Sequence, residues 1–221
     1  MLTFIKVSKE STLIEKILVA EVMKKEEILR RYISGERDFR KVELSQITLC
    51  QVELCAIDFS QANLTRSNLK GIDLSKALLT EADMTEACLE QAILCGASML
   101  LANLSQAVLT EADLREVNLS EALLYQASLR KAQLQRANLS QAILRRAFLR
   151  EANLSQANLQ QANLQQANLI NAELTGADLS GVNLEGASLV EANLKGANLE
   201  GAKLNRAILT GAVMPDGKVF N

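Results

Sequence analysis

The sequence predicts a mainly β solenoid of about nine four-sided coils with an N-terminal α-helical cap. Two observations support this prediction. From Phe39 to Met214 every fifth residue is large and apolar, and 31 of these 36 positions are Leu. The residue two places before each of them is mostly small, and 27 of those 36 residues are Ala. No insertion or deletion breaks the period over residues 37–214.

A period of five fits neither a helix, which repeats every 3.6 residues, nor a flat strand, which repeats every two. It fits a chain in which each pentapeptide forms one side of a square coil of 20 residues. The large residue, called the centre here, and the small residue two places before it then point inward, and the other three point outward. Coils stacked about 4.8 Å apart make a straight rod roughly 43 Å long, with backbone hydrogen bonds along its axis.

Residues 1–36 lack the repeat, and their pattern predicts α-helix. Thr12 and Glu15 have the spacing of a capping box, apolar residues follow at helical spacing, and Gly35 is placed to end a helix. We therefore expect one long helix or two consecutive helices over about residues 11–34. We interpret residues 1–36 as a cap on the first coil, because repeat arrays need covered ends. A partner-binding arm or a membrane-surface helix is the alternative.

The two ends of the repeat differ from its middle. Val42, Ile47, Val52 and Ile57 take the small inward position in the first coils, which suits a wider end packed against the helices. After residue 170, glycine often stands two places past the centre, where a type II turn at the corner needs a positive φ. Residues 215–221 form a turn, Pro215-Asp216-Gly217, and a short tail. The tail either covers the last coil or leaves its edge free for a second copy.

The repeat unit reads A-(N/D)-L-x-x, as in Ala152-Asn153-Leu154-Ser155-Gln156. It resembles the pentapeptide-repeat protein family over about four-fifths of the chain. This resemblance implies a right-handed quadrilateral β-helix. It also implies a cytoplasmic bacterial protein, because the family is abundant in cyanobacteria.

Composition argues against an enzyme and against a cofactor or metal site. The chain has no histidine, so it lacks the commonest general base and metal ligand, and it has no glycine-rich phosphate loop opening a helix. Cys50, Cys55, Cys88 and Cys95 all fall at outward positions and are expected to be reduced surface thiols. The net charge of −2 gives no reason to expect direct nucleic-acid binding. We find no signal peptide or membrane span, and expect a cytoplasmic protein.

Charge and exposed apolar residues single out one part of the rod. Residues 81–121 hold eight acids and one base, whereas residues 122–150 hold six bases and no acid. Several positions before a centre, elsewhere Asn or Asp, are apolar near this basic band. Exposed apolar patches can mark contact surfaces, although drift of a repeat surface also explains such residues. The candidate interaction surface consists of Cys88, Val108, Leu123, Ile143, Phe148, Arg130, Arg145, Arg146 and Arg150.

These observations favour a non-catalytic structural or interaction scaffold with an unknown protein partner, existing as a monomer or weak dimer. The alternative is a DNA mimic, because some pentapeptide-repeat proteins resemble duplex DNA in width and charge and bind type II topoisomerases such as gyrase. The rod shape agrees with that alternative, but the basic band and the small net charge do not.

Overall fold

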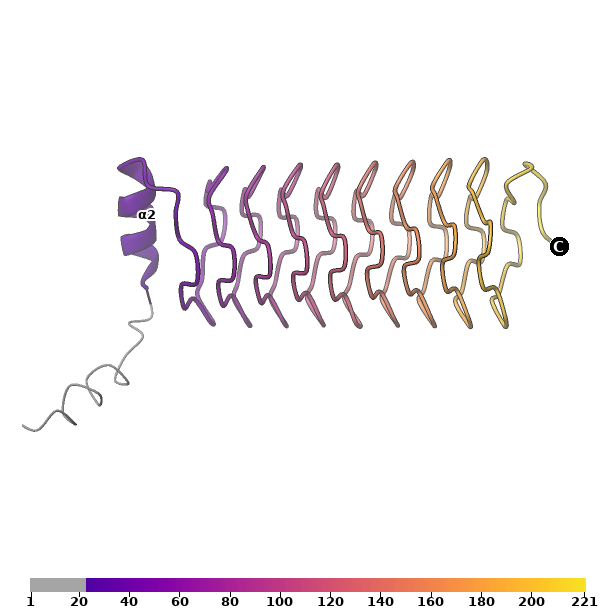
Figure 1. Ribbon diagram of the computed structural model, residues 1–221, viewed down its shortest axis with the longest axis horizontal. Coiled ribbons are helices and arrows are strands. Elements are labelled where there is room, and N and C mark those ends of the chain that lie inside the picture. The colour runs from indigo at the N-terminus through magenta and orange to yellow at the C-terminus, as the bar shows by residue number, and fades with distance from the viewer. Residues whose placement is uncertain (1–22) are drawn as a thin grey trace, which may run out of the picture.

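The computed structural model describes residues 23–221, which form a short helix followed by a straight, four-sided solenoid (Figure 1). The solenoid contains 32 parallel β-bridges, and each joins residues 20 positions apart, from Asp38↔Asp58 to Asn193↔Val213. The bridged residues are those just before each centre. The predicted coil of four pentapeptides is therefore confirmed, with no change of register along the rod.

We number the coils 1 to 9, from residues 37–56 to residues 197–216. The four sides are called faces A to D. Their first centres are Phe39 on face A, Leu44 on face B, Leu49 on face C and Leu54 on face D, and each face continues every twentieth residue.

The predicted inward and outward positions are confirmed by burial. The centres from Phe39 to Leu194 are at most 1 % exposed, and so are the small residues from Ala62 to Ala192 that precede them by two. The interior is one apolar cluster in which rings of Leu alternate with rings of Ala, and it begins with Phe39 and Phe59 packed edge to face at 5.9 Å. Alanine suits its position because the narrow tube leaves no room for a larger side chain at close-packed density.

Neighbouring coils are joined by three backbone hydrogen bonds on each face. Around Leu154, for example, Leu154 N donates to Glu173 O at 2.7 Å and Gln156 N donates to Thr175 O at 2.9 Å in the next coil. In the other direction, Asn153 N donates to Ala132 O at 3.0 Å. A fourth bond, from Ala157 N to Leu154 O at 3.0 Å, closes the corner turn. The backbone polar groups that a tube of Leu and Ala could not satisfy are thus paired along its axis.

Each corner has the positive φ that a type II turn requires at its third residue. The expected glycines are there, such as Gly176 and Gly181, both with φ +66°. Most corners, however, carry another residue: 27 non-glycine residues, many of them Gln, Glu, Lys or Arg, have φ between 54° and 60°. The sequence alone did not reveal this use of the left-handed region.

The helix α2 spans Lys25–Ile33 and lies against the first coil (Figure 1). Glu26 and Glu27 in its first turn and Arg30 and Arg31 in its last turn complement the helix dipole. Ile28 is its one fully buried residue. The part of the expected helical region before residue 23, with the predicted capping box at Thr12 and Glu15, lies outside the described residues.

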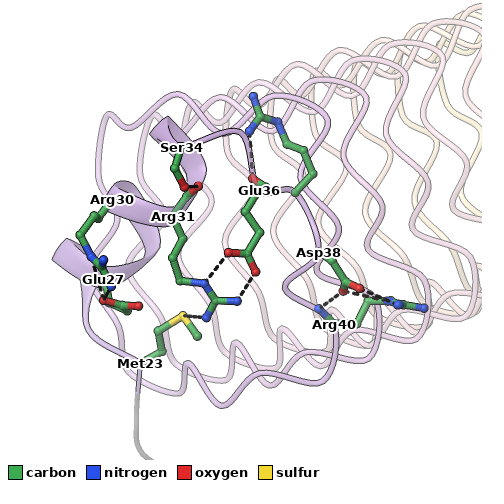
Figure 2. A network of polar contacts seen from close by, with 9 residues as sticks. Met23, Glu27, Arg30, Arg31, Ser34, Glu36, Asp38 and Arg40 are labelled. Atoms are coloured by element: carbon green, nitrogen blue, oxygen red, sulfur yellow. Dashed lines mark hydrogen bonds and ion pairs between the residues drawn. The ribbon is translucent and has the colours of Figure 1, made fainter.

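A polar network joins α2 to coil 1 (Figure 2). Gly35, with φ +98°, ends the helix, and Arg31 Nε then donates to Glu36 Oε2 at 2.7 Å. The Arg31 guanidinium also lies over the Phe39 ring, 4.8 Å from its centroid. Tyr32 donates its hydroxyl to the Cys55 carbonyl oxygen at 3.0 Å. Each of these contacts holds the helix against the solenoid.

The C-terminal tail pairs with the last coil. After the turn at Pro215–Gly217, Val219 forms an antiparallel bridge with Val213, and Phe220 N donates to Ala212 O at 2.8 Å. The tail therefore covers the coil 9 edge on one side only. The centres Leu199, Leu204 and Leu209 on the other sides stay partly exposed.

Within residues 23–221, no helix is long and apolar enough to cross a membrane.

Candidate interaction surface

The residue before each centre has a structural role that the sequence analysis did not identify. The N–H of the residue after the centre does not donate a hydrogen bond to any backbone oxygen of the ladder. Where the residue before the centre is Asn or Asp, its side-chain oxygen accepts this bond, as Asn153 Oδ1 does from Ser155 N at 3.0 Å. Asn158 and Asn163 repeat the pattern with Gln160 and Gln165 at 3.0 and 3.1 Å. The repeated Asn is thus a local acceptor that completes the backbone hydrogen bonding.

Five residues of the candidate surface occupy this position without being able to accept such a bond. These residues are Cys88, Val108, Leu123, Ile143 and Phe148. Each one forgoes a hydrogen bond that contributes about 0.5–1.5 kcal/mol on average. The four larger ones also stay exposed, from 38 % for Val108 to 47 % for Phe148. Fold stability therefore does not explain why apolar residues are used here.

The structure brings these five residues onto two neighbouring faces. Cys88, Val108 and Phe148 lie in one column of face C, with Ser128 bridging Val108 and Phe148. Leu123 and Ile143 are bridged to each other on face B. The apolar side chains thus follow coils 3 to 6 along face C and coils 5 to 6 along face B.

The four arginines of the candidate surface lie beside these columns and are exposed. Arg145 follows its centre on face B, and Arg146 occupies the corner between faces B and C. Arg130 and Arg150 follow their centres on face C and, with Phe148 and Asn168, line a shallow hollow of about 190 Å³. Phe148 is therefore flanked by guanidinium groups in its own coil and in the coil before it.

Few carboxylates neutralise these arginines. Arg150 Nε lies 3.0 Å from Glu151 Oε1, whereas Arg146 Nε donates to the neutral Gln166 side chain at 2.8 Å. Among residues 23–221, no carboxylate lies within ion-pair distance of Arg130, Arg145 or Arg146. In coils 5 and 6 the surface thus presents apolar side chains surrounded by positive charge.

Within coils 3 to 6, three other exposed apolar side chains lie outside the predicted surface. Leu78 on face A and Ile93 on face D also stand before a centre, and Leu101 takes a corner with φ +58°. The departure from Asn or Asp could have identified Leu78 and Ile93. Because they lie on different faces from Phe148, they do not extend its patch.

Groups with displaced pKa values lie away from this surface. On face D the Arg115 side chain donates to Asp113 and lowers the pKa of that carboxyl. Burial raises the pKa of the Cys55 thiol, which makes that sulfur a poorer nucleophile. Over the described part of the chain, no three His, Cys, Asp or Glu side chains are grouped as metal ligands. The candidate surface therefore offers apolar contacts and positive charge for binding.

The model of the family "Pentapeptide repeats" matches residues 57–96 and, in overlapping segments, residues 102–211. Among solved structures, HetL resembles the chain with a TM-score of 0.61 and 38 % sequence identity, covering 90 % of this chain and 100 % of HetL. HetL is a pentapeptide repeat protein involved in heterocyst differentiation regulation, from the cyanobacterium Nostoc sp. strain PCC 7120.

A second structure, full-length QnrB1, a plasmid-mediated fluoroquinolone resistance protein, gives a TM-score of 0.47 at 17 % identity, covering 72 % of this chain and 92 % of QnrB1. No curated protein matches the chain. The fold is the right-handed quadrilateral β-helix of pentapeptide repeat proteins. The family model, the identity with HetL and the unbroken five-residue register agree, and the chain belongs to the pentapeptide repeat family.

Proposed function

We propose that this protein is a non-catalytic interaction scaffold that binds a protein partner through the exposed apolar residues of coils 3 to 6 and the arginines of coils 5 and 6. The observation that supports this most is the replacement of the Asn or Asp acceptor by exposed apolar side chains beside four arginines, of which only Arg150 is paired with a carboxylate within residues 23–221. Residues that violate the local rule of a fold without a structural gain are expected at functional sites. A rigid rod holds such side chains at fixed spacing without any loop.

The similarity to HetL supports a regulatory rather than a metabolic role, since HetL is involved in the regulation of heterocyst differentiation. The four cysteines support a reducing compartment such as the cytoplasm, because all are unpaired and half-buried. No cofactor, nucleic acid or membrane enters this proposal.

The test uses substitutions that should strengthen the fold and remove the contact. Ile143→Asn on face B and Phe148→Asn on face C restore the missing acceptor, so each variant should unfold at the same or a higher temperature than the parent. Tagged parent and variant proteins are then used to capture partners from a lysate of the source organism. We expect a partner that the parent retains and that at least one of these variants loses.

Ile93→Asn on face D is the matched control, because it makes the same change at an equally exposed position, 40 % for both isoleucines. It should gain the same hydrogen bond and keep the partner. The proposal is wrong if both patch variants retain every captured protein, or if the control loses the partner to the same degree.

A further inference from the structure

Face C carries opposite charges in its two halves. Here the face is taken with the corner residues on both of its edges. In coils 3 and 4 it holds Glu86, Glu90 and Glu111 and no base, a net charge of −3. In coils 5 and 6 it holds four bases and one acid, a net charge of +3, and these residues are Arg130, Lys131, Arg146, Arg150 and Glu151. The boundary between the two halves lies between coils 4 and 5.

From this pattern we propose that face C is the contact surface for a second copy of the chain, packed side by side and antiparallel. The proposal uses the face C part of the proposed interaction surface and leaves Leu123 and Ile143 on face B accessible. The two-fold axis lies in the plane of the interface, perpendicular to the rod, and runs from edge to edge of face C between coils 4 and 5. It places coil 3 of one rod against coil 6 of the other, and coil 4 against coil 5. Such an axis keeps each edge of the face over the same edge of the partner.

This symmetry brings unlike groups together. Glu86 then faces Arg146 of the second copy, since both occupy the corner between faces B and C. Glu90 faces Arg150, both one residue past a centre. Each contact occurs twice because the interface is isologous. Opposite potentials across an interface favour this register and suppress others.

The apolar residues agree with the same register. Phe148, 47 % exposed, is placed over Cys88 of the second copy, beside Val108. These are the small and medium apolar residues of the same column. The aromatic ring thereby loses exposed surface in both copies, and a buried aromatic side chain is a common anchor in protein interfaces.

Alternative arrangements fit less well. A parallel pairing of the same faces would place the basic half against the basic half. Face D, treated in the same way, carries −2 in coils 3 and 4 against +1 in coils 5 and 6. The rod is straight, and its corners stay in line from coil to coil, so two flat faces can remain in contact over all four coils (Figure 1).

The contact spans roughly 19 Å along the rod, four coils at about 4.8 Å each. An interface of this length on one narrow face is smaller than a standard stable interface. Within one chain, Glu86 already pairs with Arg66 at 2.9 Å and Glu90 pairs with Lys70 at 3.1 Å. In the dimer each of these carboxylates is shared with an arginine of the second copy. Association should therefore be weak and sensitive to salt.

Sedimentation equilibrium of the full chain is the first test. We expect a monomer–dimer equilibrium at about 0.1 M salt that weakens strongly at about 1 M, where the Debye length falls from about 10 Å to about 3 Å. Glu86→Arg and Arg146→Glu should each weaken dimerisation at least about tenfold, because each creates two like-charge contacts. The double variant Glu86→Arg/Arg146→Glu should restore it to within about threefold of the parent.

The rescue cannot arise within one chain, because the two residues lie three coils apart, about 14 Å. Thermal unfolding of all variants checks that they fold equally well. A chain that stays monomeric at low salt, or a double variant that dimerises no better than the single ones, overturns the proposal.

Cross-linking tests the register directly. Phe148→Cys places a thiol opposite the native Cys88 of the second copy, across faces expected to lie about 10 Å apart. A short bismaleimide is therefore the suitable reagent, since a disulfide could not span that distance. Covalent dimers should form, and they should disappear in Phe148→Cys/Cys88→Ser. Equal cross-linking of Ile93→Cys on face D would contradict the arrangement.

These measurements need no other protein. A chain that captures a partner without dimerising rejects this inference alone, and a chain that dimerises without capturing a partner rejects the proposed function alone.

Discussion

At the residue scale, the corners are the least expected feature of the solenoid. Left-handed backbone costs a non-glycine residue roughly 1–2 kcal/mol, yet most corners use Gln, Glu, Lys or Arg. Long polar side chains can extend into solvent from a corner. They also bond along the column, as Gln61 Nε2 does to Glu81 Oε2 at 2.8 Å. The rigid ladder on both sides of each corner maintains the conformation.

Substitutions at Gln156, whose φ is +59°, test this account. Gln156→Gly removes the strain but adds about 0.5–1 kcal/mol of backbone entropy to the unfolded chain, so the net effect should be between zero and about 1.5 kcal/mol of stabilisation. Gln156→Val should destabilise by about 1–2 kcal/mol, because a β-branched residue fits this conformation poorly. Chemical denaturation measures both. Ser140→Val, one residue past a centre, is the control and should change stability by less than about 0.5 kcal/mol.

The small inward position predicts a second contrast. Ala157 is 1 % exposed inside the tube. Ala157→Phe should destabilise by about 3 kcal/mol or more through overpacking, because the rings of Leu on either side leave no room for the added volume. Ser155→Ala, at an outward position two residues earlier, should cost little, since Ser155 N keeps its bond to Asn153. Similar melting temperatures for the two variants would contradict the inward and outward assignment.

At the scale of elements, the N-terminal cap is a prediction that the packing of α2 makes testable. Its buried Ile28 and its half-buried Leu29 and Tyr32 contact the apolar cluster of the solenoid, as does Met23 just before the helix. Deleting residues 1–36 should expose the first coil and cause aggregation, measured by light scattering during heating. A truncated chain that stays monomeric and melts at the parent temperature would show that the cap is dispensable.

A single substitution makes the same point without a deletion. Ile28→Ala should cost about 2–5 kcal/mol, because it leaves a cavity under the helix. Ile33→Ala in the same helix is the matched control, since Ile33 is 82 % exposed. Equal unfolding free energies for these two variants would argue against packing of α2 on the coil.

The junction between α2 and coil 1 should be sensitive to acid. The bond from Arg31 lowers the pKa of Glu36, and the Arg40 side chain lowers the pKa of Asp38 to about 2. A lowered carboxyl pKa stabilises the fold above the unfolded value near 4, and this contribution is lost as the pH falls through the folded value. Thermal melts between pH 5 and pH 2 should therefore show falling stability, with a smaller fall in Glu36→Gln. Glu26→Gln, at an α2 residue with no ion pair to any residue in 23–221, should follow the parent.

At the scale of the whole molecule, the charge pattern favours an interaction scaffold over a DNA mimic. A DNA mimic needs negative charge along its length, whereas coils 5 and 6 carry a band of six bases between residues 122 and 150. We therefore expect no inhibition of DNA gyrase in a supercoiling assay at protein concentrations equal to that of the enzyme. Inhibition or protection of gyrase at such concentrations would favour the DNA-mimic alternative over the interaction scaffold.

The grouping of the apolar residues of the candidate surface could be predicted from the five-residue repeat. Because residues 20 apart stack, the sequence places Val108 near Phe148 and Leu123 beside Ile143, and the bridges agree. Which arginines remain without a carboxylate was not predictable. Each long side chain has several possible hydrogen-bond partners within reach, along the column or next to it in the sequence. Arg146 bonds to Gln166 in the next coil, whereas Arg150 bonds to the adjacent Glu151.

The five-residue pattern was sufficient to predict the coil, its length and which side chains point inward. In such an array each unit contacts only its neighbours, so the local pattern specifies the whole fold. Tertiary structure decided what depends on competition between partners. It decided that the polar corner residues adopt positive φ, and that Asn153 and its equivalents accept a backbone hydrogen bond. It also decided that the tail pairs antiparallel with Val213 and so covers one side of the last coil, while the other sides stay open. Each of these outcomes depends on which groups the finished ladder leaves unpaired, and a five-residue period does not contain that information.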